Sequence, residues 1–228
     1  MPDYLGVPIP QGTCNLCDEL FAKRQMTRHL WSCREKNPPR ARGRVKPRRE
    51  KVFHLVVEGG GLPQYWMHLE APATATLRNL DALLREVWLE CCGHLSAFTI
   101  GAEVYSVSPL LEYHERGMHI PLGNVLRSGM KFYHEYDFGT TTVLLLKVAS
   151  ETERPVWNRS IQVLARNLAP EIPCESCGKR ATQVCCICVQ GGTGWLCDDC
   201  VPKHPCEDEV FLPVVNSPRT GMCGYGGE

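Results

Sequence analysis

The stretch VFHLVVEGGGLPQYWMHLE, residues 52–70, decides the fold of this chain of 228 residues. Apolar and polar residues alternate loosely over residues 52–58, and a second extended run covers residues 65–70. Three glycines at 59–61 and a Leu-Pro pair separate the two runs. Two extended runs around a Gly/Pro cluster are typical of a β-hairpin. The glycines are expected to form a turn and not a phosphate-binding loop, because no Lys-Ser/Thr pair and no helix start follows them.

The residues that follow continue the pattern of one packed domain. Residues 76–88 carry leucines, a valine and a tryptophan at helical spacing, and Thr74 or Thr76 is a candidate N-cap. Two further strand pairs are expected, at 98–100 with 104–106 and at 131–136 with 140–148. Strands around one main helix predict an α+β domain with a small mixed sheet over residues 52–150. A β-grasp-like arrangement is one topology that fits.

Composition divides the rest of the chain into four parts. Residues 1–36 are a compact Cys/His segment, and residues 37–51 complete a basic, Pro/Arg-rich stretch that predicts a flexible linker. Residues 151–170 are expected to hold a connecting helix over 156–168, stopped by Pro170, and residues 171–228 are rich in cysteine. The net charge of zero hides an asymmetry, since residues 1–51 hold twelve Lys/Arg against five Asp/Glu. A basic arm on an acidic body points to polyanionic partners.

The first cysteine pattern has the spacing of a single zinc finger. Its four candidate ligands are Cys14, Cys17, His29 and Cys33. A Cys-x-x-Cys turn presents two thiolates from one knuckle, and residues four apart face the same side of a helix. Phe21 and Met26 stand where a ββα finger keeps its small apolar core. Four strong ligands leave no open position, so this zinc is predicted to be structural and not catalytic.

Nucleic-acid binding is a separate hypothesis for the same region. The predicted finger helix offers Lys23, Arg24 and Arg28, and the arm that follows carries Arg40, Arg42, Arg44, Lys46, Arg48 and Arg49. Basic side chains of this kind contact phosphates without regard to sequence, whereas one finger spans only about three base pairs. The alternative is a solvated linker that binds nothing.

The C-terminal cysteines predict two more tetrahedral zinc sites. The candidate ligands are Cys174, Cys177, Cys185, Cys188, Cys197, Cys200, His204 and Cys206. The first and third pairs fit one four-cysteine site, and the remaining ligands fit a second site in a cross-braced arrangement. Cys186 is an alternative to Cys185, and Cys223 is an alternative to Cys206. The spacing resembles that of B-box and MYND modules, which implies zinc and protein interaction; redox catalysis is disfavoured because no βαβ pattern surrounds any Cys-x-x-Cys pair.

The central residues also resemble a known family. They are Trp66, Leu77, Leu80, GHLSAFTIG at 93–101, Tyr105 and FYHEYDFG at 132–139, with LPVVNSPRTGMCGY at 212–225. These blocks resemble the Ri-plasmid ORF-three-like family, passenger proteins of bacterial mobile elements. The resemblance implies an α+β fold and no established biochemical activity. The family continues Asp-x-Trp-x-His after the second block, whereas this chain reads TTTVL at 140–144, so that acid and histidine are missing.

The central domain keeps its own candidates for acid–base or metal chemistry. His134 is expected to share a strand face with Tyr136, and Glu135 and Asp137 are expected on the other face. This alternation argues against one catalytic site that uses all of these residues. His94, beside Cys91 and Cys92, is another candidate metal corner. Structural roles, with His94 packed at a helix end and Asp137 capping a turn, fit the sequence better.

These patterns favour a non-enzymatic zinc protein of mobile-element type, with about three zinc ions. It is expected to contact nucleic acid through the finger and arm and protein through the rest. A protein–protein adaptor with purely structural zinc is the second hypothesis, and an enzyme using His94 or residues 134–137 is the third. The sequence has no apolar run long enough for a membrane helix and lacks the features of a secretory signal. In such a chain, Cys-x-x-Cys pairs indicate bound metal and not disulfides. A cytoplasmic protein is therefore expected.

Overall fold

A computed structural model describes residues 8–37, 48–156, 160–206 and 210–227. Most strands join one sheet of ten, in the order β2-β1-β10-β4-β3-β9-β8-β5-β6-β7. Its centre is the predicted hairpin, β3 (Arg48–Gly59) and β4 (Leu62–Pro72), whose antiparallel register runs from Val52 opposite Pro72 to Glu58 opposite Trp66. The hairpin prediction is therefore confirmed.

The remaining strands extend the hairpin on both sides. The strands on the β3 side are β9 (Thr142–Val156), β8 (Lys131–Tyr136), β5 (Ser96–Ile100), β6 (Glu103–Ser106) and β7 (Arg116–Gly117). Those on the β4 side are β10 (Gln162–Asn167), β1 (Gln11–Cys14) and β2 (Leu20–Ala22). Every neighbouring pair is antiparallel except β6 with β7. Both predicted strand pairs of the central domain are present.

The main core lies between one face of this sheet and α2 (Leu77–Leu84), which continues as a π-helix, η1 (Arg85–Leu89). Thr76 is the N-cap, because its hydroxyl accepts a hydrogen bond from the backbone N–H of Asn79. Leu80 and Trp88 are fully buried against alternate residues of the strands, such as Met67. The predicted α+β class is confirmed. Two short helices, α3 (Leu122–Val125) and η2 (Leu111–Tyr113), complete this part.

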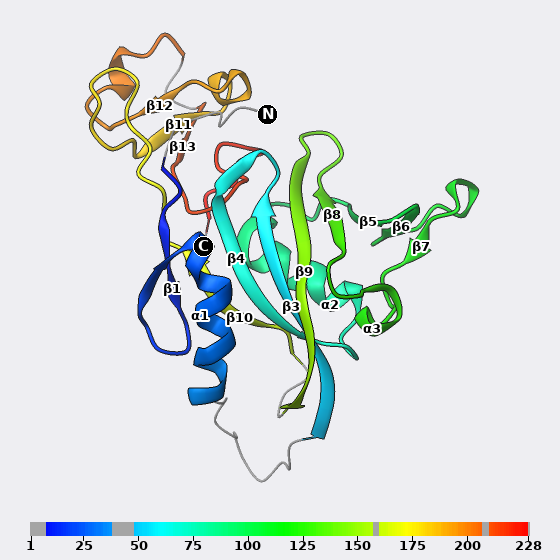
Figure 1. The fold of residues 1–228 in the computed structure, drawn as a ribbon. Coiled ribbons are helices and arrows are strands. Elements are labelled where there is room, and N and C mark those ends of the chain that lie inside the picture. The colour runs from blue at the N-terminus through cyan, green and yellow to red at the C-terminus, as the bar shows by residue number, and fades with distance from the viewer. Residues whose placement is uncertain (1–7, 38–47, 157–159, 207–209, 228) are drawn as a thin grey trace.

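Part of the opposite face of the sheet is covered by α1 (Lys23–Lys36), so that α1 and α2 lie on either side of the sheet (Figure 1). Met26 and Leu30 of α1 pack on Trp66 of β4, which is fully buried. The finger is also built into the sheet, because β1 pairs with β10 as well as with β2. The finger and the central domain therefore share one sheet.

The C-terminal region forms a small second unit at one end of the sheet (Figure 1). Its three strands are β11 (Gln183–Cys185), β12 (Trp195–Leu196) and β13 (Phe211–Pro213), with η3 (Cys188–Gly191) and η4 (Val201–Lys203) between them. The C-terminal tail, residues 214–227, returns to the central domain. There the Ser217 hydroxyl donates a hydrogen bond to the Trp88 carbonyl at 2.6 Å.

The structure corrects two predictions about the connections. The helix predicted over 156–168 is wrong, because residues 162–167 form β10. Open edges of β4 and β1 pair with this segment on both sides, and such tertiary pairing overrides a weak local preference. The predicted linker ends earlier than expected, since Arg48–Lys51 begin β3 and pair with residues 153–156 of β9. Residues 38–47 lie outside the described part. No helix among the described residues is long and apolar enough to cross a membrane.

Candidate metal centres

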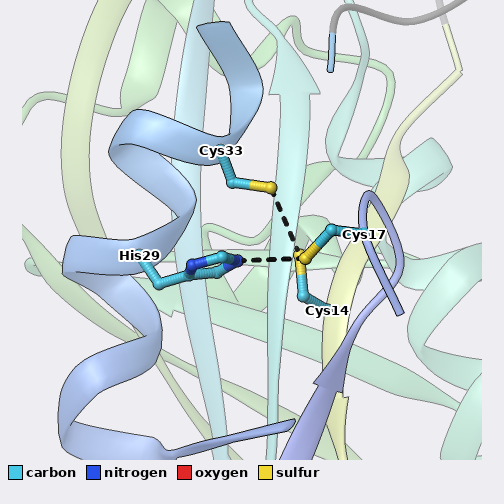
Figure 2. A group of neighbouring side chains, drawn as sticks. All are labelled: Cys14, Cys17, His29 and Cys33. Carbon is cyan, nitrogen blue, oxygen red and sulfur yellow. Dashed lines mark hydrogen bonds between the residues drawn. The ribbon is translucent and has the colours of Figure 1, made fainter. Parts of the chain in front are cut away.

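The N-terminal group brings together the four ligands predicted for the finger, Cys14, Cys17, His29 and Cys33 (Figure 2). The Sγ atoms of Cys14 and Cys33 lie 3.9 Å apart, and the Cys17 Sγ lies 3.5 Å from the His29 Nε2. A tetrahedral zinc ion with Zn–S bonds of about 2.3 Å gives S···S edges of about 3.8 Å and S···N edges of about 3.5 Å. The side chains therefore already stand at the separations that a zinc ion requires.

Local structure explains this arrangement. Cys14 ends β1, and the backbone N–H of Asp18 donates to the Cys14 carbonyl at 2.8 Å, which closes the knuckle with Asp18 at φ +61°. His29 and Cys33 stand one turn apart on α1, and the Phe21 ring stacks on His29 at 3.7 Å. Burial raises the pKa of the Cys14 thiol to about 12 in the metal-free chain. A bound cation is needed to keep this buried sulfur as a thiolate.

Two interleaved groups occupy the C-terminal unit. The first contains Cys174, Cys177, Cys197 and Cys200; the second contains Cys185, Cys188, His204 and Cys206. The Sγ atoms of Cys177 and Cys197 are 3.5 Å apart, and those of Cys188 and Cys206 are 3.8 Å apart. The groups alternate along the chain, as expected for a cross-braced arrangement. Each has four protein ligands, so neither leaves a position for substrate.

Backbone geometry supports both C-terminal groups. Burial alone would raise the pKa of Cys174. Hydrogen bonds from backbone N–H groups, including that of Cys197, outweigh burial and lower this pKa to about 6. Burial would likewise raise the pKa of Cys185, but hydrogen bonds from backbone N–H groups, including that of Cys188, lower it to about 7. A Cβ atom at Gly194, where φ is +90°, would lie 2.8 Å from the Cβ of Cys188, so the second group needs glycine at this position.

The structure distinguishes the alternatives that the sequence left open. Cys185 lies in the second C-terminal group, whereas the Cys186 thiol turns away and donates to the carbonyl of Val210. Cys206 also lies in that group, and Cys223 lies elsewhere.

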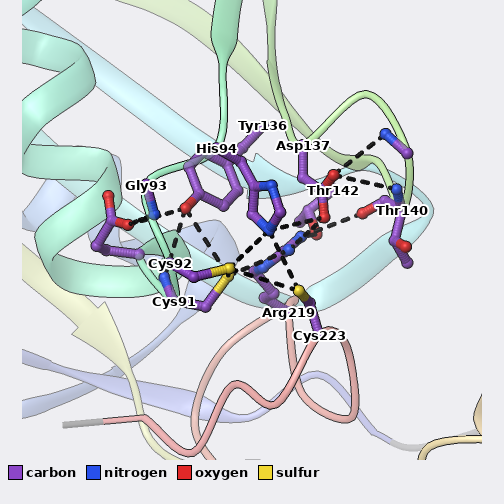
Figure 3. A network of polar contacts seen from close by, with 12 residues as sticks. Cys91, Cys92, Gly93, His94, Tyr136, Asp137, Thr140, Thr142, Arg219 and Cys223 are labelled. Carbon is purple, nitrogen blue, oxygen red and sulfur yellow. Dashed lines mark hydrogen bonds and ion pairs between the residues drawn. The ribbon is translucent and has the colours of Figure 1, made fainter.

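A fourth group joins segments far apart in the sequence, namely Cys91, Cys92, His94 and Cys223 (Figure 3). The sequence indicated only the corner formed by Cys91, Cys92 and His94. No motif spacing links Cys223 to these residues, because Cys223 follows Cys92 by 131 residues. Its thiol nevertheless lies 3.7 Å from the Cys92 Sγ and 3.2 Å from the His94 Nε2.

The acid–base candidates of the central domain do not converge on one cavity in the described structure. His134 is fully buried, and its Nε2 lies 2.8 Å from an oxygen of Asp81 on α2. Asp137 instead accepts a hydrogen bond from Arg219 at 2.6 Å and from two backbone N–H groups in the turn after β8. His94 lies 3.5 Å from Asp137, among the cysteines. His134 is therefore paired with α2, whereas His94 and Asp137 lie together beside the fourth cysteine group.

The candidate nucleic-acid residues have different environments. The Lys23 ammonium is engaged by Glu58 and by the carbonyl of Pro63, both at 3.0 Å. Arg24 and Arg28 are exposed on α1, and Arg48 and Arg49 are exposed at the start of β3. Arg40, Arg42, Arg44 and Lys46 lie outside the described residues.

An open groove of about 820 Å³ runs between α1 and the part of the same sheet face that α1 leaves uncovered, here called the open face. Its basic lining residues are Lys23, Arg24, Lys131 and Lys147, and Glu58 is its acidic one. Lys131 and Lys147 were not among the residues that the sequence singled out. Their positions on the open face follow from strand alternation, but their closeness to α1 does not.

Comparisons with known proteins leave the function open. No family model and no curated protein matches the chain. A protein of unknown function from Methanosarcina mazei Go1 is similar in structure, with 18% sequence identity and a TM-score of 0.44. The match covers 57% of this chain and 75% of that one, and such a likeness carries no functional argument. The resemblance to the Ri-plasmid family therefore stays a prediction. The described residues contain four Cys/His clusters that could hold metal, which fits a zinc-binding role.

Proposed function

We propose that this protein is a non-enzymatic, zinc-stabilised nucleic-acid-binding protein of the mobile-element type, and that the groove between α1 and the open face of the sheet contacts the sugar–phosphate backbone. The groove's basic lining is the observation that carries this proposal. Zinc in the N-terminal group holds α1 against the sheet and so maintains one wall of the groove.

The charges in the groove favour a polyanion. Lys131 of β8 and Lys147 of β9 are directly opposite each other in the ladder. Like charges at such positions repel, and this repulsion is relieved when a phosphate binds between them. Within the described part of the chain, Arg24, Lys131 and Lys147 form no ion pair, whereas Glu58 is neutralised by Lys23.

An aromatic side chain lies on the same face as these cations. Tyr133 stands two residues after Lys131 on β8, so both side chains point to the open face, and Tyr133 is 49% exposed. An exposed ring beside basic side chains gives unpaired bases a surface on which to stack. We therefore expect single strands to bind more tightly than duplexes of the same length.

Fluorescence anisotropy of the full zinc-loaded chain with labelled DNA and RNA, across a salt series, tests this function. The test variant is Lys131→Ala/Lys147→Ala. Its matched control is Arg78→Ala/Lys203→Ala, which removes the same charge from exposed positions on α2 and η4. Point variants are preferable to removing residues 1–51, because that deletion also removes β1, β2, α1 and the start of β3.

We expect the groove variant to bind all sequences more weakly and its salt slope to fall by about 1.5, since each lost phosphate contact contributes roughly 0.7 to 0.9. The control should retain the slope of the parent chain. Absence of binding at about 50 mM salt, or equal slopes for the two variants, would refute the proposal. In the first case the adaptor hypothesis, with protein contacts made by the C-terminal unit, would take its place.

A further inference from the structure

The fourth cysteine group differs from the other three in its position. Cys91, Cys92 and His94 lie between η1 and β5, at one end of the main core, whereas Cys223 belongs to the C-terminal tail. Figure 3 shows the four side chains meeting beside Arg219, which comes from the same tail as Cys223. We propose that these four residues bind a zinc ion that clamps the C-terminal tail onto the central domain.

The sulfur–sulfur distances of this group fit one tetrahedral ion. The Cys92 Sγ lies 3.6 Å from the Cys91 Sγ and 3.7 Å from the Cys223 Sγ, close to the sulfur–sulfur edge of about 3.8 Å around zinc. The His94 Nε2 lies 2.9 Å and 3.2 Å from the sulfurs of Cys92 and Cys223, inside the sulfur–nitrogen edge of about 3.5 Å, so the imidazole would move outward by a few tenths of an ångström when zinc binds. All four ligand atoms lie within 4.8 Å of one another. Three thiolates and one imidazole in this arrangement favour zinc over harder cations.

Charge around the group supports a bound thiolate centre. One divalent zinc with three thiolates carries a net charge of −1, and the Arg219 guanidinium donates a hydrogen bond to the Cys91 Sγ at 3.4 Å. Arg219 is fully buried and is fixed by Asp137 and by the Thr142 hydroxyl, at 2.6 Å and 3.0 Å. Hydrogen bonds from fixed donors orient metal-bound ligands and balance their charge. The tail therefore brings both a ligand and a counter-charge to the centre.

The backbone of the tail positions the Cys223 thiol. Cys223 adopts a left-handed conformation, with φ at +47°, between Gly221 and Gly224, whose φ angles are also positive. A residue other than glycine in this region costs about 1 kcal/mol and persists only where its surroundings hold it. The turn is closed by a hydrogen bond from the backbone N–H of Tyr225 to the Met222 carbonyl at 2.8 Å, and it directs the exposed Cys223 thiol at Cys92. A metal–sulfur bond to Cys223 would add a second hold on this turn.

Exposure also makes this centre the most accessible of the four. Cys92 and Cys223 are exposed and Cys91 and His94 are half-buried, whereas each of the other groups contains at least one buried ligand. With four protein ligands its zinc has no open position, so its role is to hold the tail and not to catalyse. Chelators should remove this ion first, and alkylating reagents should then reach its cysteines first. Loss of the ion should release the tail while the three other centres keep their zinc.

Zinc stoichiometry of the purified full-length chain, measured by elemental analysis, tests the proposal. The test variant is Cys223→Ser, and the matched control is Cys186→Ser. Cys186 belongs to none of the four groups, and all 14 cysteines lie among the described residues. We expect four zinc ions in the parent chain and in the control, and three in Cys223→Ser. Hydrogen exchange in residues 214–227 should rise in the test variant alone. Equal zinc content in Cys223→Ser and the parent chain would overturn the proposal.

A second measurement on the parent chain keeps the proposal testable if Cys223→Ser does not fold. A metal-sensitive dye should withdraw one equivalent of zinc in a distinct fast phase. N-ethylmaleimide added after that phase should label Cys91, Cys92 and Cys223 before the cysteines of the other three groups, as read by mass spectrometry; Cys186, which belongs to no group, is left out of this comparison. Release in a single phase, or first labelling at the cysteines of another group, would refute the clamp. Neither measurement depends on nucleic-acid binding.

Discussion

Acidification should destabilise this protein through two histidines that no metal group uses. His54 of β3 and His68 of β4 are buried beneath α1, and the Nε2 of His54 lies 2.8 Å from the Nδ1 of His68. Burial, together with the nearby Arg34 guanidinium, lowers the pKa of His54 to about 2 and that of His68 to about 3. Both rings are therefore neutral in the folded chain at pH 5.5, whereas in the unfolded chain they titrate near their ordinary pKa of about 6.5.

The magnitude follows from this difference. Between pH 7.5 and pH 5.5 the unfolded chain takes up protons on these two rings that the folded chain does not. Stability from a base with a lowered pKa is complete above the unfolded pKa and falls as the pH drops below it. Each histidine then contributes a loss of about 1.4 kcal/mol over this interval, so the pair contributes about 3 kcal/mol.

Urea unfolding at several pH values, with free zinc held constant by a metal buffer, measures this loss. The double variant His54→Gln/His68→Gln keeps polar groups in the pair but removes its titration. Zinc release and the titration of all other groups are common to both chains. The difference between the two pH slopes of the free energy of unfolding therefore isolates the two histidines. Parallel slopes would refute the reasoning. If the variant does not fold, NMR of the parent chain replaces it, since the ring signals of His54 and His68 should not shift between pH 7.5 and 5.5.

Three further predictions concern packing and metal. Gly12→Ala should detach the finger from the sheet, because the added Cβ would stand 2.5 Å from the Arg166 carbonyl oxygen and against the Trp66 ring; hydrogen exchange in β1 should rise sharply. Leu80→Ala should lower the free energy of unfolding by about 3 kcal/mol in urea titrations, since Leu80 is fully buried, whereas Ile187→Ala, at a largely exposed residue, should change it by less than about 0.5 kcal/mol. Chelation of all zinc should abolish exchange protection in residues 171–213 while the sheet keeps most of its own, because the C-terminal unit has only small apolar clusters. Loss of protection in both regions together would contradict this last expectation.

Local patterns predicted the parts of the protein that local physics governs. The hairpin over residues 52–70 follows from alternation and from the glycine turn, and α2 follows from apolar spacing with a Thr76 cap. Three of the four cysteine groups contain the residues that spacing suggested, because a Cys-x-x-Cys knuckle brings its thiolates together within one turn.

The errors and omissions arise where distant segments meet. Residues 162–167 have no local signal strong enough to reveal a strand, and they form one because β4 and β1 offer backbone partners on both sides. No sequence pattern indicated that Arg219 would be buried against Asp137, 82 residues away. Such pairings depend on where the tail returns, which no periodicity encodes.

The sequence by itself therefore determined the α+β class, the central hairpin and helix, and the cysteine spacing, since each depends on neighbours within a few turns of chain. The tertiary structure decided the rest. Pairing of β1 with β10 merged the finger into the central sheet, and the position of α1 turned Lys131 and Lys147 into one wall of a groove. The return of the tail placed Cys223 beside Cys92 across 131 residues. These arrangements follow from burying two faces of one sheet at once, a condition that the whole chain must satisfy together.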